Sequence, residues 1–166
     1  MGADPAENLR LVRELIEAFA AFDFERLRDE MQRDPTTLES RLAEFGELHQ
    51  RLVDPNIEID ITAMEGWIVF LPPDGRGQGL DTWREFWRNW FDAWSTQEIE
   101  YRGWESGGDW VSVEARNLMR GRTSGVEVRV AVVQLWRLRE GRIVGFSVYP
   151  TRERALAAVG NPQRGR

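Results

Sequence analysis

Few residue types in this chain are able to carry chemistry. The 166-residue sequence contains 22 arginines and no lysine, no cysteine and a single histidine, His49. Without lysine there is no Schiff-base amine or P-loop lysine, and without cysteine there is no thiolate nucleophile or thiolate metal ligand. One imidazole per chain also excludes a two-histidine metal site. The sequence therefore predicts no cofactor and no metal, and it leaves carboxylates, His49 and aromatic side chains as the functional groups.

His49 is the first candidate for proton transfer. The pKa of an unperturbed histidine lies near neutrality, which suits a general base. The residue falls in a predicted helix beside an apolar stripe. The alternative interpretation is a surface or boundary histidine without a catalytic role.

Tryptophan is the most informative residue type, because the chain contains eight of them. Four lie at three-four spacing on one predicted helix, which is typical of core packing or of a dimer interface. The sharper alternative is a cavity that stacks on a flat apolar ligand and offers a few inward polar groups. The candidate ligand-binding residues are Trp67, Trp83, Trp87, Tyr101, Asn117, Gln134 and Trp136.

Hydrophobic spacing predicts the elements that position these residues. Helices are expected over 5–31, with a break near 22–24 and a short second helix over 25–32, and then over 37–52, 80–94 and 151–159. Strands are expected over 56–62, 99–104, 110–120, 126–139 and 142–149, and a loop rich in proline and glycine over 71–79. Helices followed by a meander of strands predict an α+β domain whose helices cover one face of a curved sheet.

Length and polarity predict a single domain over 1–160 and a flexible tail over 161–166. The net charge of −6 argues against nucleic acid, and no apolar run approaches the ~20 residues of a membrane span. The polar, acidic N-terminus is unlike a signal peptide, so we expect a cytoplasmic protein. The expected partners are a small apolar or aromatic ligand and a second copy of the chain, forming a homodimer through the outer sheet face.

The order of these elements resembles a known family. NLRLVRELIEAF followed by DFERL looks like its opening helices, LVDPNIEI like the entry to its first strand, and GLDTWREFWRNWFDAW like the helix after its loop glycine. RGRTSGVEVRVAVVQLWRLREGRIVGFSVYPTRERALAAVG looks like its closing hairpins and terminal helix. This family is the SnoaL-like polyketide cyclases of the nuclear transport factor 2-like superfamily. The resemblance implies a cone-shaped α+β fold with a curved antiparallel or mixed sheet and N-terminal helices over one face.

The resemblance also implies candidate catalytic groups. Steroid isomerases of the superfamily use an acid on the first strand, and Asp60 is its nearest counterpart. Strand alternation argues against that role, because Ile57, Ile59 and Ile61 are expected to face the core and Asp60 to face outward. Limonene-type epoxide hydrolases combine an arginine with two acids, but alternation places the pair Glu114 and Arg116 outside as well.

The sequence differs from the usual pattern of the family at several positions. A predicted helical insertion at about 32–51 replaces a connection that is short in the family. Trp83 and Trp87 stand where relatives often have smaller aliphatic residues. Gln134 stands where a polar aromatic residue or histidine is common. No acid occurs near Ser147 and Val148. We therefore expect a modified cavity for a small apolar or aromatic molecule, with cofactor-independent isomerisation, cyclisation, dehydration or hydrolysis by proton transfer. The alternative is a non-catalytic ligand-binding or dimerisation module, since a fold does not decide function.

Overall fold

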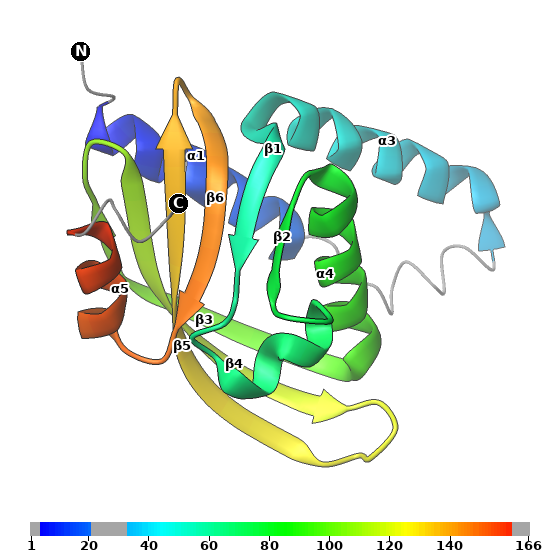
Figure 1. Ribbon diagram of the computed structural model, residues 1–166. Coiled ribbons are helices and arrows are strands. Elements are labelled where there is room, and N and C mark those ends of the chain that lie inside the picture. Colours follow the sequence, from blue (N-terminus) through cyan, green and yellow to red (C-terminus); the bar gives the residue numbers. More distant parts are fainter. Residues whose placement is uncertain (1–3, 21–32, 161–166) are drawn as a thin grey trace.

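A curved six-stranded sheet forms the body of the molecule (Figure 1). The computed structural model describes residues 4–20 and 33–160. In chain order the described elements are α1 (Pro5–Ala20), α3 (Pro35–Leu52), β1 (Val53–Asp60), the 3-10 helix η1 (Glu65–Phe70), β2 (Arg76–Gln78), α4 (Leu80–Ala93), β3 (Trp94–Ser106), β4 (Trp110–Gly121), β5 (Glu127–Arg139), β6 (Arg142–Tyr149) and α5 (Arg152–Val159). The predicted α+β class is confirmed. The predicted helix over 25–32 and the predicted tail over 161–166 lie outside the described residues.

The strands lie in the order β2-β1-β6-β5-β4-β3. Neighbours are antiparallel except β1 and β6, which run parallel. In the register of the three central strands, Trp136 of β5 lies between Val111 of β4 and Phe146 of β6. Alternate side chains that point to the same side of the sheet therefore form a continuous inner face across β4, β5 and β6.

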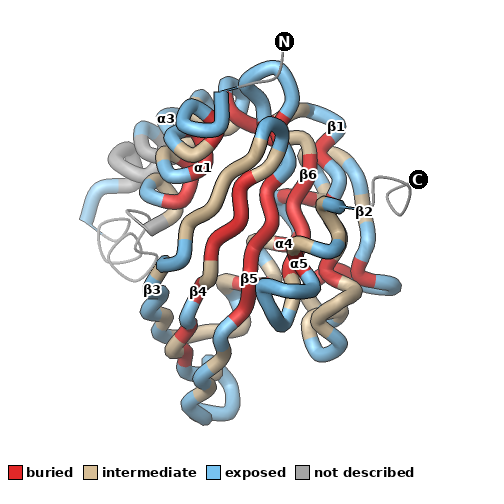
Figure 2. The backbone as a smooth tube through the Cα atoms, turned by 90° about the vertical axis from the view of Figure 1, so that its left-hand side faces the viewer, coloured by how far each residue is buried: buried red, intermediate tan, exposed pale blue. Residues whose placement is uncertain are grey.

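Side-chain alternation predicts correctly which face of each strand is buried. Ile57, Ile59 and Ile61 are all at most 2% exposed, whereas the Glu58 and Asp60 side chains are about half exposed. Apolar side chains of one parity are shielded from water, which supplies the main driving force for packing the sheet against helices. Figure 2 shows the same pattern, with buried segments concentrated in β4, β5 and β6 and with exposed residues along the edge strand β3.

The helices contact different parts of the sheet. α1 packs on β3 and β4, α4 packs on β1, β2 and β3, and α3 contacts α1, β1 and β6. α5 contacts β4, β5 and β6 on the other face of the sheet, where Ser112, Leu135 and Ser147 are buried. No helix in the described part of the chain is long and apolar enough to cross a membrane.

The segment 71–79, predicted as a loop, contains the short strand β2. It pairs antiparallel with β1, with Gly77 opposite Ile59. A Cβ atom at Gly77 would collide with the Thr82 side chain, so the glycine allows α4 to begin close to the strand. Sequence reasoning missed β2 because prolines and glycines disfavour a strand in general, whereas a three-residue edge strand tolerates them.

Two features fix α1 on the molecule. At its start, the backbone N–H of Ala6 donates to the Asp4 carboxylate over 3.0 Å, so Asp4 caps the helix. One turn later, Asn8 is 1% exposed, and its Nδ2 atom donates to the carbonyls of Gly107 (3.4 Å) and Gly108 (3.1 Å) in the turn between β3 and β4. Asn8 thereby joins the first helix to a hairpin about 100 residues later in the chain.

Replacement of Asn8 by alanine is expected to lower the free energy of unfolding by about 1 kcal/mol, because it removes two partly buried hydrogen bonds to the hairpin. Urea denaturation measures the loss. Asn56→Ala is the matched control, since the Asn56 side chain is exposed and should change stability by less than about 0.5 kcal/mol. Equal losses in the two variants would show that the contact does not hold α1 on the hairpin.

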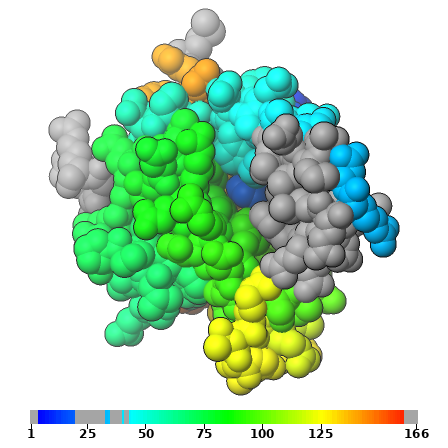
Figure 3. Space-filling model, turned by 90° about the vertical axis from the view of Figure 1, so that its right-hand side faces the viewer, coloured from blue at the N-terminus to red at the C-terminus, as the bar shows by residue number. Residues whose placement is uncertain are grey.

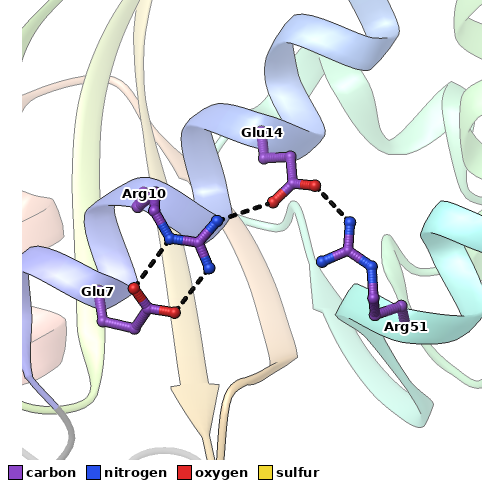
Figure 4. Close-up of polar contacts among 4 residues, drawn as sticks. All are labelled: Glu7, Arg10, Glu14 and Arg51. Atoms are coloured by element: carbon purple, nitrogen blue, oxygen red, sulfur yellow. Dashed lines mark hydrogen bonds and ion pairs between the residues drawn. The ribbon is translucent and has the colours of Figure 1, made fainter.

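An ion-pair chain links α1 to α3 (Figure 4). Arg10 contacts Glu7 (2.6 Å) and Glu14 (3.2 Å) on its own helix, and Glu14 also pairs with Arg51 in the last turn of α3. Because these pairs are largely exposed to water, each contributes little to stability. Their main effect is to fix the C-terminal end of α3, and therefore His49, beside α1.

Candidate functional site

The inner face of the sheet meets α4 in a cluster of aromatic rings. Trp83 of α4 lies edge-on to Phe146 (5.5 Å between ring centroids) and to Trp136 (6.0 Å), and the last two rings are 4.6 Å apart. All three side chains are at most 2% exposed. We call Trp83, Trp136 and Phe146 the inner cluster. It joins two of the predicted ligand-binding tryptophans that are 53 residues apart in the chain.

A second group of rings comes from three helices and is called the three-helix cluster. Phe19 of α1 is its centre, with Trp87 at 4.7 Å, Phe45 at 5.2 Å, His49 at 5.5 Å and Phe91 at 6.3 Å. All of these side chains are partly buried. The cluster adjoins the inner cluster, because Phe19 and Trp87 both contact Trp83.

The surface is hollowed where these helices meet. Figure 3 shows a depression between the segments of α3 and α4, with part of α1 visible at its base. The three-helix cluster is built from the same helices.

The predicted cavity residue Trp67 lies elsewhere. Its ring contacts Trp90 (4.5 Å) and Phe70 (6.3 Å), and these rings continue to Trp94. We call Trp67, Phe70, Trp90 and Trp94 the η1 cluster. The tryptophans of α4 are thus divided among the clusters, with Trp83 in the inner cluster, Trp87 in the three-helix cluster and Trp90 in the η1 cluster. Trp94 joins the η1 cluster from the start of β3.

Polar side chains interrupt the apolar inner face of the sheet. Gln134 is 7% exposed, as its position beside Val132 and Trp136 predicts, and its amide lies against the Tyr101 hydroxyl. Burial raises the pKa of Tyr101 to about 12, and the contact with Gln134 opposes this shift. Tyr101 is therefore a neutral hydroxyl at physiological pH. Asn117, 6% exposed, instead donates its Nδ2 hydrogens to the carbonyls of Ala115 (3.2 Å) and Val130 (3.4 Å).

Several buried polar atoms of this region are unpaired. Within the described part of the chain, no group lies at hydrogen-bonding distance from the Gln134 Oε1 atom or from the indole N–H groups of Trp83, Trp87 and Trp136. Buried polar groups are nearly always hydrogen-bonded, because leaving one unpaired costs about 1–3 kcal/mol. One acceptor and several donors thus remain free between the sheet and α4.

His49 lies in the last turn of α3 with its imidazole between Phe19 and Phe45. Its Nδ1 atom is 3.0 Å from the carbonyl oxygen of Phe45. Burial lowers the pKa of His49, the hydrogen bond to Phe45 opposes that shift, and the positive charge of Arg84 lowers the pKa further. The imidazole is therefore neutral at pH 7.

Asp60, the other candidate for proton transfer, stands at the exposed end of β1. Its carboxylate accepts hydrogen bonds from the backbone N–H (3.0 Å) and the hydroxyl (2.6 Å) of Thr62 and pairs with Arg76 at 3.4 Å. These contacts stabilise the turn after β1. The Asp60 side chain is 46% exposed.

The outer face carries the predicted pair of Glu114 and Arg116, which are 2.9 Å apart, with Arg102 also contacting Glu114 at 3.1 Å. All three side chains are at least one-third exposed. The epoxide-hydrolase arrangement is therefore not built at this position. The homodimer expected through this face stays a prediction. In the described ranges 4–20 and 33–160, no group of three or more carboxylates or histidines is placed to hold a metal ion.

Sequence reasoning identified the inner polar residues but missed the role of Phe19. That residue belongs to the predicted apolar stripe of the first helix, where its spacing indicates only core packing. A second aromatic residue four positions before His49, Phe45, is the signal that was available, because residues at this spacing share one helix face. Only the packing of α3 against α1 brings these rings together.

The fold and the site define the class of protein. A cone-like curved sheet with helices over its inner face is the nuclear transport factor 2-like architecture. The SnoaL-like domain model matches residues 12–146, and the chain belongs to this family. No curated protein of known function matches the chain in sequence.

Solved structures agree with this assignment. An NTF2-like protein of unknown function from Burkholderia pseudomallei superimposes with a TM-score of 0.59 at 18% identity, covering 91% of this chain and 95% of that chain. A candidate SnoaL-like polyketide cyclase from Jannaschia gives 0.53 at 18% identity, with coverage of 74% and 80%. TerC, co-crystallised with polyporic acid, gives 0.50 at 15% identity, with coverage of 68% and 83%. At these identities the similarity establishes the fold.

Proposed function

We propose that the protein binds a small, flat, mostly apolar molecule between the inner face of the sheet and the helices α1, α3 and α4. The unpaired polar atoms carry this proposal. Gln134 Oε1 needs a donor, and the indole N–H groups of Trp83, Trp87 and Trp136 need acceptors. A ligand that carries both a hydroxyl group and a carbonyl oxygen on an aromatic or unsaturated ring offers a donor and acceptors and matches the apolar walls.

The aromatic rings determine the shape of the ligand. Trp87 and Phe19 are partly buried and lie 4.7 Å apart with a tilt of 37°. Rings in such arrangements stack on flat unsaturated surfaces better than on puckered ones. The fold is compatible with a ligand of this kind, since its neighbour TerC was crystallised with the small molecule polyporic acid.

The reaction class that fits these residues is cofactor-independent proton transfer, such as isomerisation, cyclisation, dehydration or hydrolysis. Tyr101 is a neutral hydroxyl, and His49 is a neutral imidazole beside the hollow. The alternative is a module that binds the ligand without converting it. Proton exchange into a bound ligand distinguishes the two functions.

The binding proposal is tested by isothermal titration calorimetry with β-tetralone, a flat bicyclic ketone, and with its saturated analogue β-decalone. We expect β-tetralone to bind more tightly. Trp87→Phe should weaken its binding about tenfold, because a ring surface and one donor are lost. Trp94→Phe is the matched control. It makes the same change on a partly buried tryptophan whose N–H is also unpaired within the described chain, but in the η1 cluster.

Two results would contradict the binding proposal. The first is equal affinity for the flat and the saturated ketone, which would remove the argument from stacking. The second is an equal effect of Trp87→Phe and Trp94→Phe, which would place the ligand outside the hollow. Thermal unfolding of both variants verifies that each remains folded during the titration.

A further inference from the structure

We propose that His49 accepts a proton from the bound ligand through its Nε2 atom. This inference rests on the proposed function, because it requires a ligand in the hollow between α3 and α4. It goes further by assigning the base to α3, the inserted helix, and by requiring a ligand with an acidic C–H or O–H group. The position of the imidazole, its tautomer and its charge all suit this role.

The position of His49 is set by the rings around it. Phe45 lies 4.2 Å away on the same helix, Phe19 of α1 lies 5.5 Å away edge-on, and Trp83 of α4 lies at 6.5 Å. Side chains from three helices therefore enclose the imidazole where α1, α3 and α4 meet. A ligand that stacks on Trp87 or Phe19 would lie next to this imidazole.

The tautomer of His49 follows from one hydrogen bond. A carbonyl oxygen only accepts hydrogen bonds, so the contact of 3.0 Å between Nδ1 and the Phe45 carbonyl places the hydrogen on Nδ1. In the neutral ring Nε2 then carries a lone pair and is an acceptor. The same bond fixes the ring plane, in the way that a carboxylate or carbonyl orients a catalytic histidine.

The electrostatic surroundings suit reversible proton transfer. Burial and the positive charge of Arg84, from α4, keep the imidazole neutral at pH 7 and ready to accept a proton. After the transfer, the imidazolium lies in the last turn of α3, where the carbonyl end of the helix favours a positive charge. Because burial and Arg84 disfavour the cation, it is formed only transiently and returns its proton readily.

The transfer is balanced without any redox partner. In an enolisable ketone, the C–H bond next to the carbonyl breaks and its proton moves to Nε2. The electron pair forms the new C=C bond while the carbonyl electrons move to oxygen as an enolate. Return of the proton to carbon regenerates neutral His49. The indole N–H of Trp83, unpaired within the described chain, is a suitable donor to the developing oxyanion.

Asp60 is less suited to this task than His49. Its carboxylate is already engaged by the Thr62 hydroxyl at 2.6 Å and by Arg76, and nearly half of it is open to water. Its oxygen atoms are therefore already occupied by contacts within the turn after β1. His49, in contrast, leaves Nε2 without a hydrogen bond among the contacts of the described residues.

The first test uses the ligand-free protein. Because His49 is the only histidine, nitrogen-15 NMR of the imidazole reports on this residue alone. We expect the Nδ1–H tautomer and a pKa below the ordinary 6.5. The unfolded chain then binds more protons than the folded one just below pH 6.5, so this group's contribution to stability is complete above pH 6.5 and is lost as the pH falls. A dominant Nε2–H tautomer would overturn the proposal.

The second test measures deuterium exchange into β-tetralone in deuterium oxide by mass spectrometry. The wild-type protein should accelerate exchange over buffer, and His49→Gln should reduce the acceleration by about a hundredfold or more. The double variant H49Q/Q50H is the matched control. It keeps the composition and moves the imidazole to the exposed neighbouring position, so it should be as slow as His49→Gln.

Calorimetry with the same ketone separates the two proposals. We expect His49→Gln to bind β-tetralone within about threefold of wild type, because the aromatic contacts remain. Normal binding with exchange that is unaffected by His49→Gln, or is restored by H49Q/Q50H, overturns the assignment of His49 and leaves the binding function intact. Absence of binding to the wild-type protein overturns both.

Discussion

Trp83→Ala is expected to lower the free energy of unfolding by about 3–5 kcal/mol, a large part of the total stability of an ordinary domain. The side chain is 1% exposed and joins α4 to the sheet through Trp136 and Phe146. Its removal opens a large cavity that neighbouring rings are too rigid to fill. Chemical denaturation followed by far-ultraviolet circular dichroism measures the effect independently of tryptophan emission.

Two further variants identify the cause of that loss. Trp83→Phe keeps an edge-on ring against Phe146 and should therefore lose clearly less stability than the alanine variant. Arg84→Ala, at the next and exposed position of α4, should change stability by less than about 0.5 kcal/mol. If Trp83→Ala costs less than about 1 kcal/mol, the inner cluster does not hold α4 on the sheet.

Removal of the polar pair Gln134 and Tyr101 is expected to separate stability from ligand binding. In the double variant Q134L/Y101F, both partners of the contact become apolar with similar shapes, and the unpaired Oε1 atom is eliminated. Such a replacement is nearly neutral or stabilising, so we expect a gain of about 0–2 kcal/mol in the free energy of unfolding. Affinity for β-tetralone should fall about tenfold or more, because the ligand loses its polar partners.

The single variants provide the control for the double one. Gln134→Leu alone leaves the Tyr101 hydroxyl buried without its amide partner, so it should be less stable than the double variant. The expected difference is about 1 kcal/mol. A double variant that loses several kcal/mol would mean that the amide has a structural role, and unchanged ketone affinity would remove Gln134 from the binding site.

Much of the fold follows from local patterns in the sequence. The period-two alternation of Ile57, Ile59 and Ile61 predicts the buried face of β1, and the glycines between the later strands predict the hairpins. The short elements η1 and β2 were not predicted. They depend on contacts with α4 and β1 rather than on a periodic pattern of their own. β3 also begins five residues earlier than predicted, because Trp94 pairs with Gly121 as soon as α4 ends.

The site is less accessible to sequence reasoning than the fold. Alternation along β5 correctly places Gln134 and Trp136 inside, since strand parity is a local property. The division of the tryptophans is a tertiary property, and Trp67 packs with Trp90 rather than with Trp83. The environment of His49 depends on how α3 lies against α1, which no spacing within α3 predicts. The pattern over 37–52 also predicts Thr37 as a helix cap and Leu38 and Leu42 as buried residues, and these three lie outside the described side chains.

The parallel pairing of β1 with β6 determines when the sheet is completed during synthesis. Val53 pairs with Ile143 and Asp60 with Ser147, so β1 lacks its neighbour on the β6 side until residues 142–149 have left the ribosome. The strands β3, β4 and β5 pair only with elements next to them in the chain and are free to assemble earlier. A nascent or truncated chain that stops before residue 142 would expose the isoleucines of β1 beside unpaired backbone groups, a typical substrate for chaperones and a starting point for aggregation.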